Sequence, residues 1–135
     1  MKQHSFAADR ELIQALEKRS QPVPCQEGCV LFSQGEAPKG VYIIESGEAY
    51  LMLESESGGA VMCLQADAGS LLGLPGIVGN QPYTMTAMAH KGSNVRFVAR
   101  NDFEDITRTE PSLYPMVLRV LAAEIRTARQ VLSGN

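Results

Sequence analysis

The amino-acid sequence predicts a mainly β protein with flanking α-helices, built as a double-stranded β-helix (a jelly-roll-like β-roll). Residues 27–100 carry apolar side chains with a period of two, and glycines interrupt this stretch at short intervals. Short strands joined by frequent tight turns are typical of sandwiches and barrels. A short helical pattern precedes this stretch and a longer one follows it. We therefore expect a single domain over residues 1–135.

The composition is that of an ordinary folded domain. The chain has 135 residues, of which 44% are hydrophobic and 20% charged, enough for one core. The formal net charge is -3, whereas a surface that binds nucleic acid needs a basic face, so we expect no direct DNA binding. No apolar run approaches the length of a membrane span, and the first residues lack the apolar core of a signal peptide. We expect a cytoplasmic protein without membrane contact.

The segment DRELIQALE, at residues 9–17, has the pattern of a short amphipathic helix. Asp9 is a residue type that caps helix N-termini. The apolar side chains that share one face of this helix are Leu12, Ile13 and Leu16. The segment QPVP, at residues 21–24, then breaks the helix because proline cannot continue it.

Within the strand region, the clearest hairpin signal is the pair of glycines at residues 58–59. This pair separates two apolar runs, at residues 51–53 and 61–64, which we expect to be paired strands. Residues 94–99 alternate in the same way and are expected to form the closing strand. A short helix is expected to follow at residues 101–108.

The chain has three cysteines, Cys25, Cys29 and Cys63. An odd number of cysteines without a secretory context argues against a disulfide framework. An iron–sulfur cluster requires four thiolates, more than this chain has. Cys29 opens an alternating apolar run, and Cys63 lies within another. We therefore expect all three to be small apolar core residues, and we expect no cofactor.

Residues 116–132 contain no helix breaker and are expected to form a long helix, with bounds of about 112–132. Its apolar side chains fall on one stripe close to coiled-coil spacing: Leu113, Val117, Val120, Leu121, Ala128, Val131 and Leu132. A single β-roll covers only part of such a helix, so we expect the stripe to pair with a second copy in a homodimer. The alternative is a helix that lies wholly on its own barrel.

Three segments carry a resemblance to a known family: CVLFSQGE at residues 29–36, GVYIIESGEAYLML at 40–53, and GSLLGLPGIVGNQPYTMTAMA at 69–89. Their turns and strands, followed by glycines with the spacing of a phosphate-binding cassette, resemble the cyclic nucleotide-binding domain of CRP/FNR-type bacterial regulators. The resemblance covers roughly residues 12–132. It implies a regulatory sensor whose long C-terminal helix closes the ligand pocket and pairs with its twin across a two-fold axis.

The cassette departs from this family's pattern at two strong ligand contacts. The family's Gly-Glu opening falls on Gly73 and Leu74, so the carboxylate that accepts from the ribose 2′-hydroxyl is replaced by an alkyl group. The family's Arg followed by Ser or Thr falls on Tyr83 and Thr84, so the phosphate's cation is replaced by a phenol while the hydroxyl remains. A buried anion without a cation costs several kcal/mol, and arginine is the side chain best suited to supply one.

The resemblance also marks the other positions of the expected site. The base-contacting position on the long helix falls near Ala128, with Thr127 beside it. A weak anion nest could still form from the Thr84 hydroxyl and the backbone N–H groups around Gly73 and Gly76. The candidate ligand-binding residues are Gly73, Leu74, Gly76, Ile77, Tyr83, Thr84 and Ala128.

We interpret the chain as a sensory domain with a degenerate cassette, which senses a different small-molecule effector or acts through contacts with a protein partner. The segment GNQPY at residues 79–83 resembles the branch of the family that senses signals other than cyclic nucleotides. One alternative is a cyclic AMP or cyclic GMP receptor with relocated phosphate contacts. Arg96 and Arg100 are the nearest arginines in sequence, although alternation along the closing strand favours surface positions for both. The other alternative is a ligand-free protein-interaction module.

An enzyme is not expected. Cupin enzymes share the jelly-roll architecture and bind a metal through clustered histidines, whereas His4 and His90 are far apart in this sequence. The sequence contains neither a nucleophile-elbow motif nor a Walker-type phosphate loop. We therefore expect neither catalytic residues nor a metal site.

Overall fold

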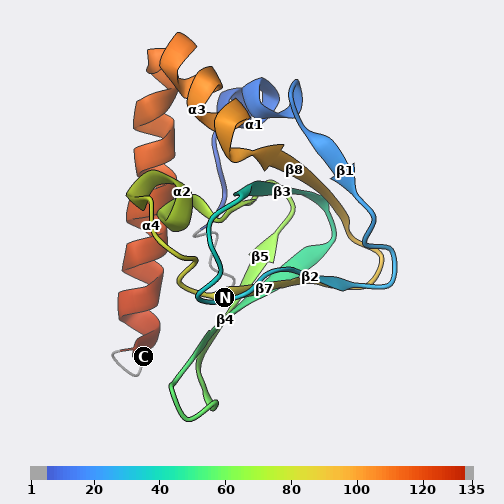
Figure 1. Cartoon of the computed structure of the whole chain (residues 1–135), viewed down its shortest axis with the longest axis vertical. Coiled ribbons are helices and arrows are strands. Elements are labelled where there is room, and N and C mark those ends of the chain that lie inside the picture. Colours follow the sequence, from blue (N-terminus) through green and yellow to red (C-terminus); the bar gives the residue numbers. More distant parts are fainter. Residues whose placement is uncertain (1–5, 133–135) are drawn as a thin grey trace.

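The computed structural model describes residues 6–132 and confirms the predicted fold class (Figure 1). Over this range, eight strands form two antiparallel four-stranded sheets that make up a β-roll, accompanied by four α-helices. The long helix α4 runs along one side of the roll, next to α2, while α1 and α3 lie at one end.

The first sheet has the strand order β1-β8-β3-β6, and the second has the order β2-β7-β4-β5. The strands are β1 (Gln21–Val23), β2 (Cys29–Phe32), β3 (Gly40–Ser46), β4 (Glu48–Glu54), β5 (Ala60–Asp67), β6 (Leu71–Leu72), β7 (Thr86–Ala89) and β8 (Asn94–Ala99). The helices are α1 (Arg10–Glu17), α2 (Leu74–Gly79), α3 (Arg100–Thr109) and α4 (Tyr114–Leu132), with a 3₁₀ turn at Pro111–Leu113.

Buried side chains form two clusters on opposite faces of the first sheet. One cluster fills the interior of the roll and includes Phe32, Ile44 and Leu51. The other lies under the helices and includes Val41 and the buried side chains of all four of them. Strand β3 contributes to both clusters, because successive strand residues point to opposite faces and both faces are covered here. This explains the nearly continuous apolar run in GVYIIES.

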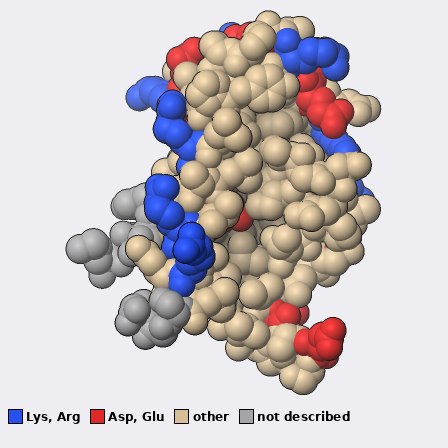
Figure 2. All heavy atoms as spheres, turned by 90° about the vertical axis from the view of Figure 1, so that its left-hand side faces the viewer, with Lys and Arg blue, Asp and Glu red and all other residues tan. Residues whose placement is uncertain are grey.

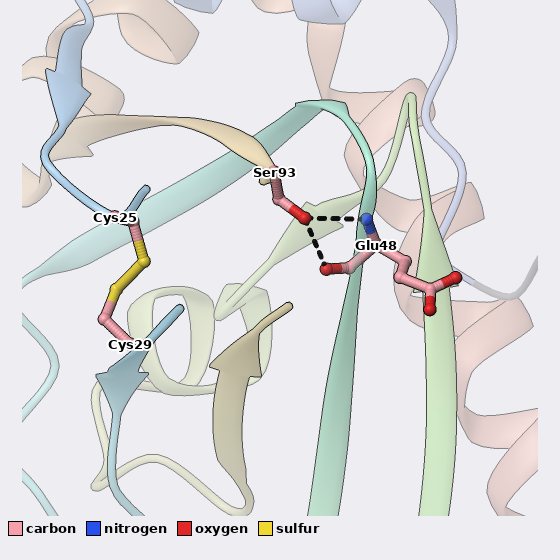
Figure 3. The surroundings of a disulfide bond; sticks show 4 residues. All are labelled: Cys25, Cys29, Glu48 and Ser93. Carbon is pink, nitrogen blue, oxygen red and sulfur yellow. Dashed lines mark hydrogen bonds between the residues drawn. A yellow bond between two sulfur atoms is a disulfide. The ribbon is translucent and has the colours of Figure 1, made fainter. Parts of the chain in front are cut away.

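The turn between β3 and β4 requires glycine. Gly47 has a φ of +85°, and a Cβ at this position would lie 2.3 Å from the Oγ of Ser93. That hydroxyl accepts from the N–H of Glu48 and donates to the Glu48 carbonyl, both at 3.0 Å (Figure 3). The predicted hairpin is confirmed as well: β4 pairs with β5, and the Ser55 N–H donates to the Gly59 carbonyl at 2.9 Å.

The first helix forms as predicted, but Asp9 acts differently from the expected cap. Asp9 occupies the N-cap position of α1, yet in the described part of the chain its carboxylate makes no capping hydrogen bond. The carboxylate instead accepts from the guanidinium of Arg119 on α4. Asp9 therefore connects two helices that are far apart in sequence.

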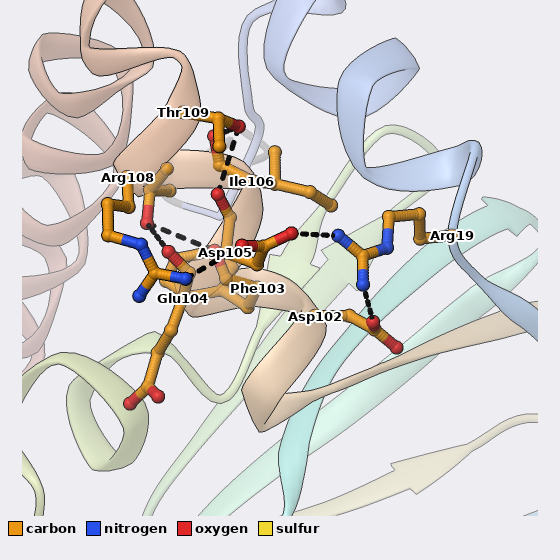
Figure 4. Close-up of polar contacts among 9 residues, drawn as sticks. Arg19, Asp102, Phe103, Glu104, Asp105, Ile106, Arg108 and Thr109 are labelled. Atoms are coloured by element: carbon orange, nitrogen blue, oxygen red, sulfur yellow. Dashed lines mark hydrogen bonds and ion pairs between the residues drawn. The ribbon is translucent and has the colours of Figure 1, made fainter.

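Helices α1 and α3 are held together by an exposed cluster of charges around Arg19 (Figure 4). The Arg19 guanidinium donates to the carboxylates of Asp102 and Asp105 on α3, and Arg108 also donates to Asp105. The hydrogen bond from Arg19 holds the pKa of the Asp105 carboxyl below its usual value. Because exposed ion pairs add little to the free energy of unfolding, we infer that this cluster mainly fixes the orientation of the two helices.

The segment QPVP, which was predicted only to end the first helix, also forms a strand. Residues Gln21–Val23 form the edge strand β1, in which Gln21 pairs with Phe97 and Val23 with Val95 on β8. Proline is tolerated in an edge strand, where its lack of an N–H removes no necessary hydrogen bond. The sequence prediction began the sheet region at residue 27 and missed this strand.

The prediction that all three cysteines are free core residues is wrong in part for each of them: Cys25 and Cys29 are not free, and Cys63 is not buried. Cys25 and Cys29 form a disulfide across the turn that leads into β2, with their Cα atoms 5.5 Å apart (Figure 3). The Gly28 N–H donates to the Cys25 carbonyl at 3.1 Å, and this tight turn brings the two side chains together. Cys25 is buried as expected. Cys63 is exposed on β5, because its neighbours in the strand alternate toward the core.

The C-terminal half of the helical layer matches its prediction closely. Helix α3 covers the expected 101–108, β8 is the expected closing strand, and α4 agrees with the expected bounds of about 112–132. Its packing corrects one prediction, however. Leu113, Val117 and Val120 were expected to lie on the stripe that faces a second copy, but all three are buried within their own domain.

Candidate functional site

A hollow of about 370 Å³ lies between the β-roll and α4; we call it the α4 hollow. Its walls come from β4, β5, α2, the loop that follows α2, and α4. The lining residues are Leu53, Met62, Pro75, Gln81, Thr84, Met85, Leu121, Glu124, Ile125, Ala128 and Leu132. Most of these side chains are apolar, and the volume lies within the range of small-molecule sites.

A second, much smaller cavity adjoins the hollow, and we call it the inner cavity. Its volume is about 10 Å³, about the space that one water molecule needs. The lining residues are Phe32, Leu51, Gly73, Pro75, Gly76, Tyr83, Thr84, Met85 and Glu124. Four of these residues, Pro75, Thr84, Met85 and Glu124, line both cavities.

The structure brings five of the seven predicted site residues to these cavities. Gly73, Gly76 and Tyr83 line the inner cavity, Ala128 lines the α4 hollow, and Thr84 lines both. The remaining two, Leu74 and Ile77, are buried in the cluster under the helices and line neither cavity. Contact of any of the seven with a ligand stays a prediction.

Leu74 and Ile77 face away because the cassette contains a helix. Helix α2 begins after Gly73, and its residues at spacing i, i+3 share one face, which here is the buried one. No helix was predicted for this segment from the sequence. Pro75 in the first helical turn was the available signal, since proline favours that position. The residue that replaces the family's carboxylate therefore serves to pack α2.

Gly73 has a structural role at the start of this helix. Its φ is +95°, and a Cβ would lie 3.2 Å from both the Gly40 carbonyl oxygen and the Tyr83 ring. The glycine therefore lets the chain turn sharply while Tyr83 packs directly against it.

Tyr83, which stands at the position of the family's arginine, is held firmly by the protein itself. Its hydroxyl donates to the Gly40 carbonyl at 2.7 Å and accepts from the N–H groups of Lys39 and Gly40 at 3.0 and 3.1 Å. Its ring stacks on Phe32, with 4.0 Å between ring centroids. The phenol is buried and its hydrogen-bonding capacity is used by the backbone. Its ring packs directly against Gly73 and Gly76, two glycines of the predicted phosphate cassette.

Glu124 is the functional candidate that the sequence analysis missed. It lies on α4, one helical turn before the predicted position Ala128, and its side chain is 7% exposed. Its Oε1 has no hydrogen-bond partner among the described residues. Burial raises the pKa of this carboxyl to about 7. The signal was the spacing of Val120, Glu124 and Thr127, which places a glutamate on the buried face.

Neither cavity offers a cation from the described residues that line it. Arg96 bonds to the Oγ and carbonyl of Ser20, at 2.6 and 3.1 Å, and Arg100 bonds to Glu104 and Asn80. Both arginines are partly exposed, Arg96 on β8 and Arg100 as the first residue of α3. Among the described residues that line the two cavities, Glu124 is thus the only charged one.

Among residues 6–132, no three His, Cys, Asp or Glu side chains gather closely enough to hold a metal ion. None of the helices in this range combines the length and apolar character needed to cross a membrane.

Comparison with known proteins relates this fold and site to a family. The model of the family described as "Cyclic nucleotide-binding domain" matches residues 22–110. The fumarate and nitrate reduction regulatory protein of Vibrio cholerae is 26% identical over 122 residues, which make up 90% of this chain and 47% of that protein. The chain therefore spans about half the length of this curated relative.

Solved structures with similar folds include regulators from two other bacteria. The catabolite activator protein of Thermus thermophilus superimposes with a TM-score of 0.78 at 20% identity, over 93% of this chain and 59% of that one. The sensor domain of the transcriptional regulator DNR from Pseudomonas aeruginosa gives a TM-score of 0.65 at 19% identity, over 94% and 83% of the two chains. At these identities, the likeness shows a shared fold.

Proposed function

This chain belongs to the cyclic nucleotide-binding domain family, as a regulatory domain of the CRP/FNR type. We propose that it senses an effector other than a cyclic nucleotide. The observation that carries the proposal is that the Tyr83 side chain is buried and bonded to the protein's own backbone. At the position of the family's phosphate-binding arginine, a buried phenol is bound to the backbone of residues 39–40 and leaves a cavity of about 10 Å³.

Electrostatics support the same proposal. The ring phosphate of a cyclic nucleotide is a permanent anion and needs a cation or several donors when it is buried. The residues that line the two cavities supply no Lys, Arg or His, and they include the carboxyl group of Glu124. An anionic ligand would therefore meet repulsion where the family's ligands meet attraction.

The position of the α4 hollow suggests how an effector would act. The hollow is bounded by the roll on one side and by α4 on the other, so a ligand within it would contact both. Leu121 and Ile125 line the hollow and also lie on the outward side of α4, where Ile125 is 58% exposed. Binding would therefore change the environment of a helix face that is available to a partner.

We propose that this helix face pairs with a second copy in a homodimer. Residues spaced alternately by four and three positions, the a/d pattern of a coiled coil, lie on it: Tyr114, Leu118, Leu121, Ile125, Ala128 and Leu132. Leu118 is 61% exposed and has no role in the core of its own domain. Leu121, Ala128 and Leu132 of the predicted stripe belong to this face, which we call the α4 face.

Further statements about partners remain proposals from the sequence. The single-domain organisation over 1–135, the cytoplasmic location and the lack of direct DNA binding are of this kind. The exposed α4 face also favours the second candidate function, a protein-interaction module with a vestigial pocket, in which a different protein covers that face.

A thermal-shift screen tests the proposed function. The protein would be heated with cyclic AMP, with cyclic GMP and with a general set of neutral and cationic metabolites. We expect no shift with either nucleotide and a shift with at least one other compound, since ligand at a hundred times its Kd adds about 2.7 kcal/mol of stability. A shift with a cyclic nucleotide contradicts the proposal, and no shift with any compound favours the interaction module.

A further inference from the structure

We propose that the α4 hollow is a receptor site for a small, mainly apolar amine whose ammonium group pairs with the Glu124 carboxylate. The inference rests on the proposed function, because it names the chemical class that the same site would accept. It concerns the charge and shape of the effector, which neither the fold nor the family specifies.

The first support is the placement of Glu124. Glu124 lines both the α4 hollow and the inner cavity, so this residue lies where the two meet. It is 7% exposed, and its Oε1 is buried without a hydrogen-bond partner among the described residues. An unpaired buried carboxyl is costly, so such a group in a cavity wall indicates a partner that the cavity admits.

The second support is the charge of the surroundings. Figure 2 shows the face of the molecule that carries α4, where a small acidic area near the middle is bordered by uncharged surface and several Lys and Arg side chains lie to one side of it. The other polar side chains that line the α4 hollow, Gln81 and Thr84, are neutral. In the inner cavity, the hydroxyl of Tyr83 is already bonded to the backbone. None of the described residues that line the two cavities is a cation that would neutralise the carboxylate, and a ligand cation would do so.

The third support is the apolar character of the remaining wall. Leu53, Met62 and Met85 line the side of the roll, and Leu121 and Ile125 line the side of α4. These side chains favour a hydrocarbon body, and methionine adapts readily to different ligand shapes. A hydrophilic cation would leave this surface poorly covered. An apolar anion would place two negative charges together, whereas an apolar amine satisfies both the wall and the carboxylate.

A set of three matched probes tests the proposal: 4-phenylbutylamine, 4-phenylbutanol and 4-phenylbutanoate. They are phenylalkyl compounds with the same total number of carbon atoms, and they carry a cationic, a neutral and an anionic end. Binding would be followed by NMR of ¹³C-labelled methionine methyl groups, because Met62 and Met85 line the hollow. At pH 8, where Glu124 is mainly ionised, we expect the amine to bind at least tenfold more tightly than either other probe.

Two variants test whether Glu124 causes the preference for the amine probe. Glu124→Gln keeps the shape of the side chain and removes its charge, so the amine should lose about tenfold in affinity while the alcohol changes little. Glu110→Gln is the matched control, because Glu110 is exposed and lines neither cavity, and it should keep the affinities of the unaltered protein. The probe series on the unaltered protein remains decisive even if Glu124→Gln fails to fold.

The outcomes separate the inference from the proposed function. Equal or tighter binding of 4-phenylbutanoate overturns the amine inference and leaves a non-nucleotide sensor in place. Failure of all three probes to shift the Met62 and Met85 signals also overturns the inference. Binding of cyclic AMP at the same methionines overturns the proposed function itself, whichever probe binds best.

Discussion

At the scale of single residues, Tyr83 ties the cassette to the start of β3. Its hydroxyl bonds to the backbone of Lys39 and Gly40, and its ring stacks on Phe32. Because Gly40 is buried, loss of the hydroxyl would leave its N–H and C=O without this partner. The residue that replaces the family's arginine thus acts as an internal link of the fold.

We predict that Tyr83→Phe lowers the free energy of unfolding by about 1–3 kcal/mol, the cost of leaving buried polar groups unpaired. Urea denaturation would measure the change. Tyr114→Phe is the matched control, because Tyr114 is exposed and the same atom is removed there; it should unfold like the unaltered protein. An unchanged midpoint for Tyr83→Phe would show that its hydroxyl bonds contribute nothing.

Glu124 should make stability depend on pH. Burial raises its pKa from an ordinary value of 4.5 to about 7, so the folded state retains a proton that the unfolded state loses between these values. The free energy of unfolding should therefore fall as pH rises from about 4.5 to above 7, by up to about 3 kcal/mol in total. Tyr83 is the only other ionisable residue that lines either cavity, and its hydroxyl is bonded to backbone.

The measurement is a difference between two proteins. Urea unfolding at several pH values between 5 and 8 would be compared for the unaltered protein and Glu124→Gln, so that the other carboxylates cancel. We expect Glu124→Gln to gain relative stability toward pH 8. Parallel pH profiles for the two proteins would mean that Glu124 titrates normally and is not desolvated.

Some residues of the site could be predicted from the sequence, and others could not. Gly76, Tyr83 and Thr84 were predicted because they lie within one contiguous cassette, and the structure places all three at the inner cavity. Glu124 was missed because burial of a charge depends on how α4 rotates against the roll. Leu74 was predicted to face the site, but it packs under α2. Its side chain points away from the site because this segment is a helix, which was not predicted from the sequence.

At the scale of elements, α4 divides its apolar side chains between two faces. Val117 and Val120 pack within the domain, while Leu118 and Ile125 are exposed. An exposed apolar face of this regularity is typical of a helix that pairs with another. Pairing through the α4 face would cover these side chains.

We predict that the protein is a dimer in solution and that Leu118→Arg converts it into a folded monomer. The arginine would place an unpaired charge in the buried seam, which an interface of modest size does not tolerate. Light scattering would give the mass, and circular dichroism would check that the variant folds. Leu118 lines neither cavity, so the change leaves the hollow intact. A monomeric unaltered protein at high concentration would refute the dimer.

The disulfide between Cys25 and Cys29 should contribute modestly to stability. Because it closes a short loop, with a sequence separation of 4, chain entropy gives about 2 kcal/mol. We predict that a reductant, or the double change Cys25→Ser with Cys29→Ser, lowers the unfolding free energy by about this amount. Cys63→Ser should have no such effect, because Cys63 is exposed and unpaired. Equal stability with and without reductant would argue that the bond contributes nothing.

Elements with a strong local pattern were predicted well from the sequence. The hairpin around Gly58, the closing strand β8 and the long helix α4 all have clear periodicity or turn residues. The edge strand β1 was missed because Pro22 indicated only a break, and its pairing with β8 joins segments far apart in the chain. The disulfide was missed because its formation depends on the turn at Gly28, which a count of cysteines does not describe.

At the scale of the whole molecule, the site and the α4 face share residues. Leu121, Ile125 and Leu132 line the α4 hollow and also belong to the α4 face. An effector that enters the hollow and a partner that covers the face would therefore meet the same side chains. In this account, the domain reports its ligand through α4, and the ligand's charge is selected by Glu124.

The central claim is that this member of the cyclic nucleotide-binding domain family does not bind cyclic nucleotides. Isothermal titration calorimetry of the unaltered protein with cyclic AMP and cyclic GMP tests it most directly. We expect no binding heat above dilution with either nucleotide at up to millimolar concentration, because Tyr83 replaces the family's arginine with a phenol bound to the backbone and Glu124 would repel an anion. A Kd of micromolar or below for either nucleotide would contradict the account.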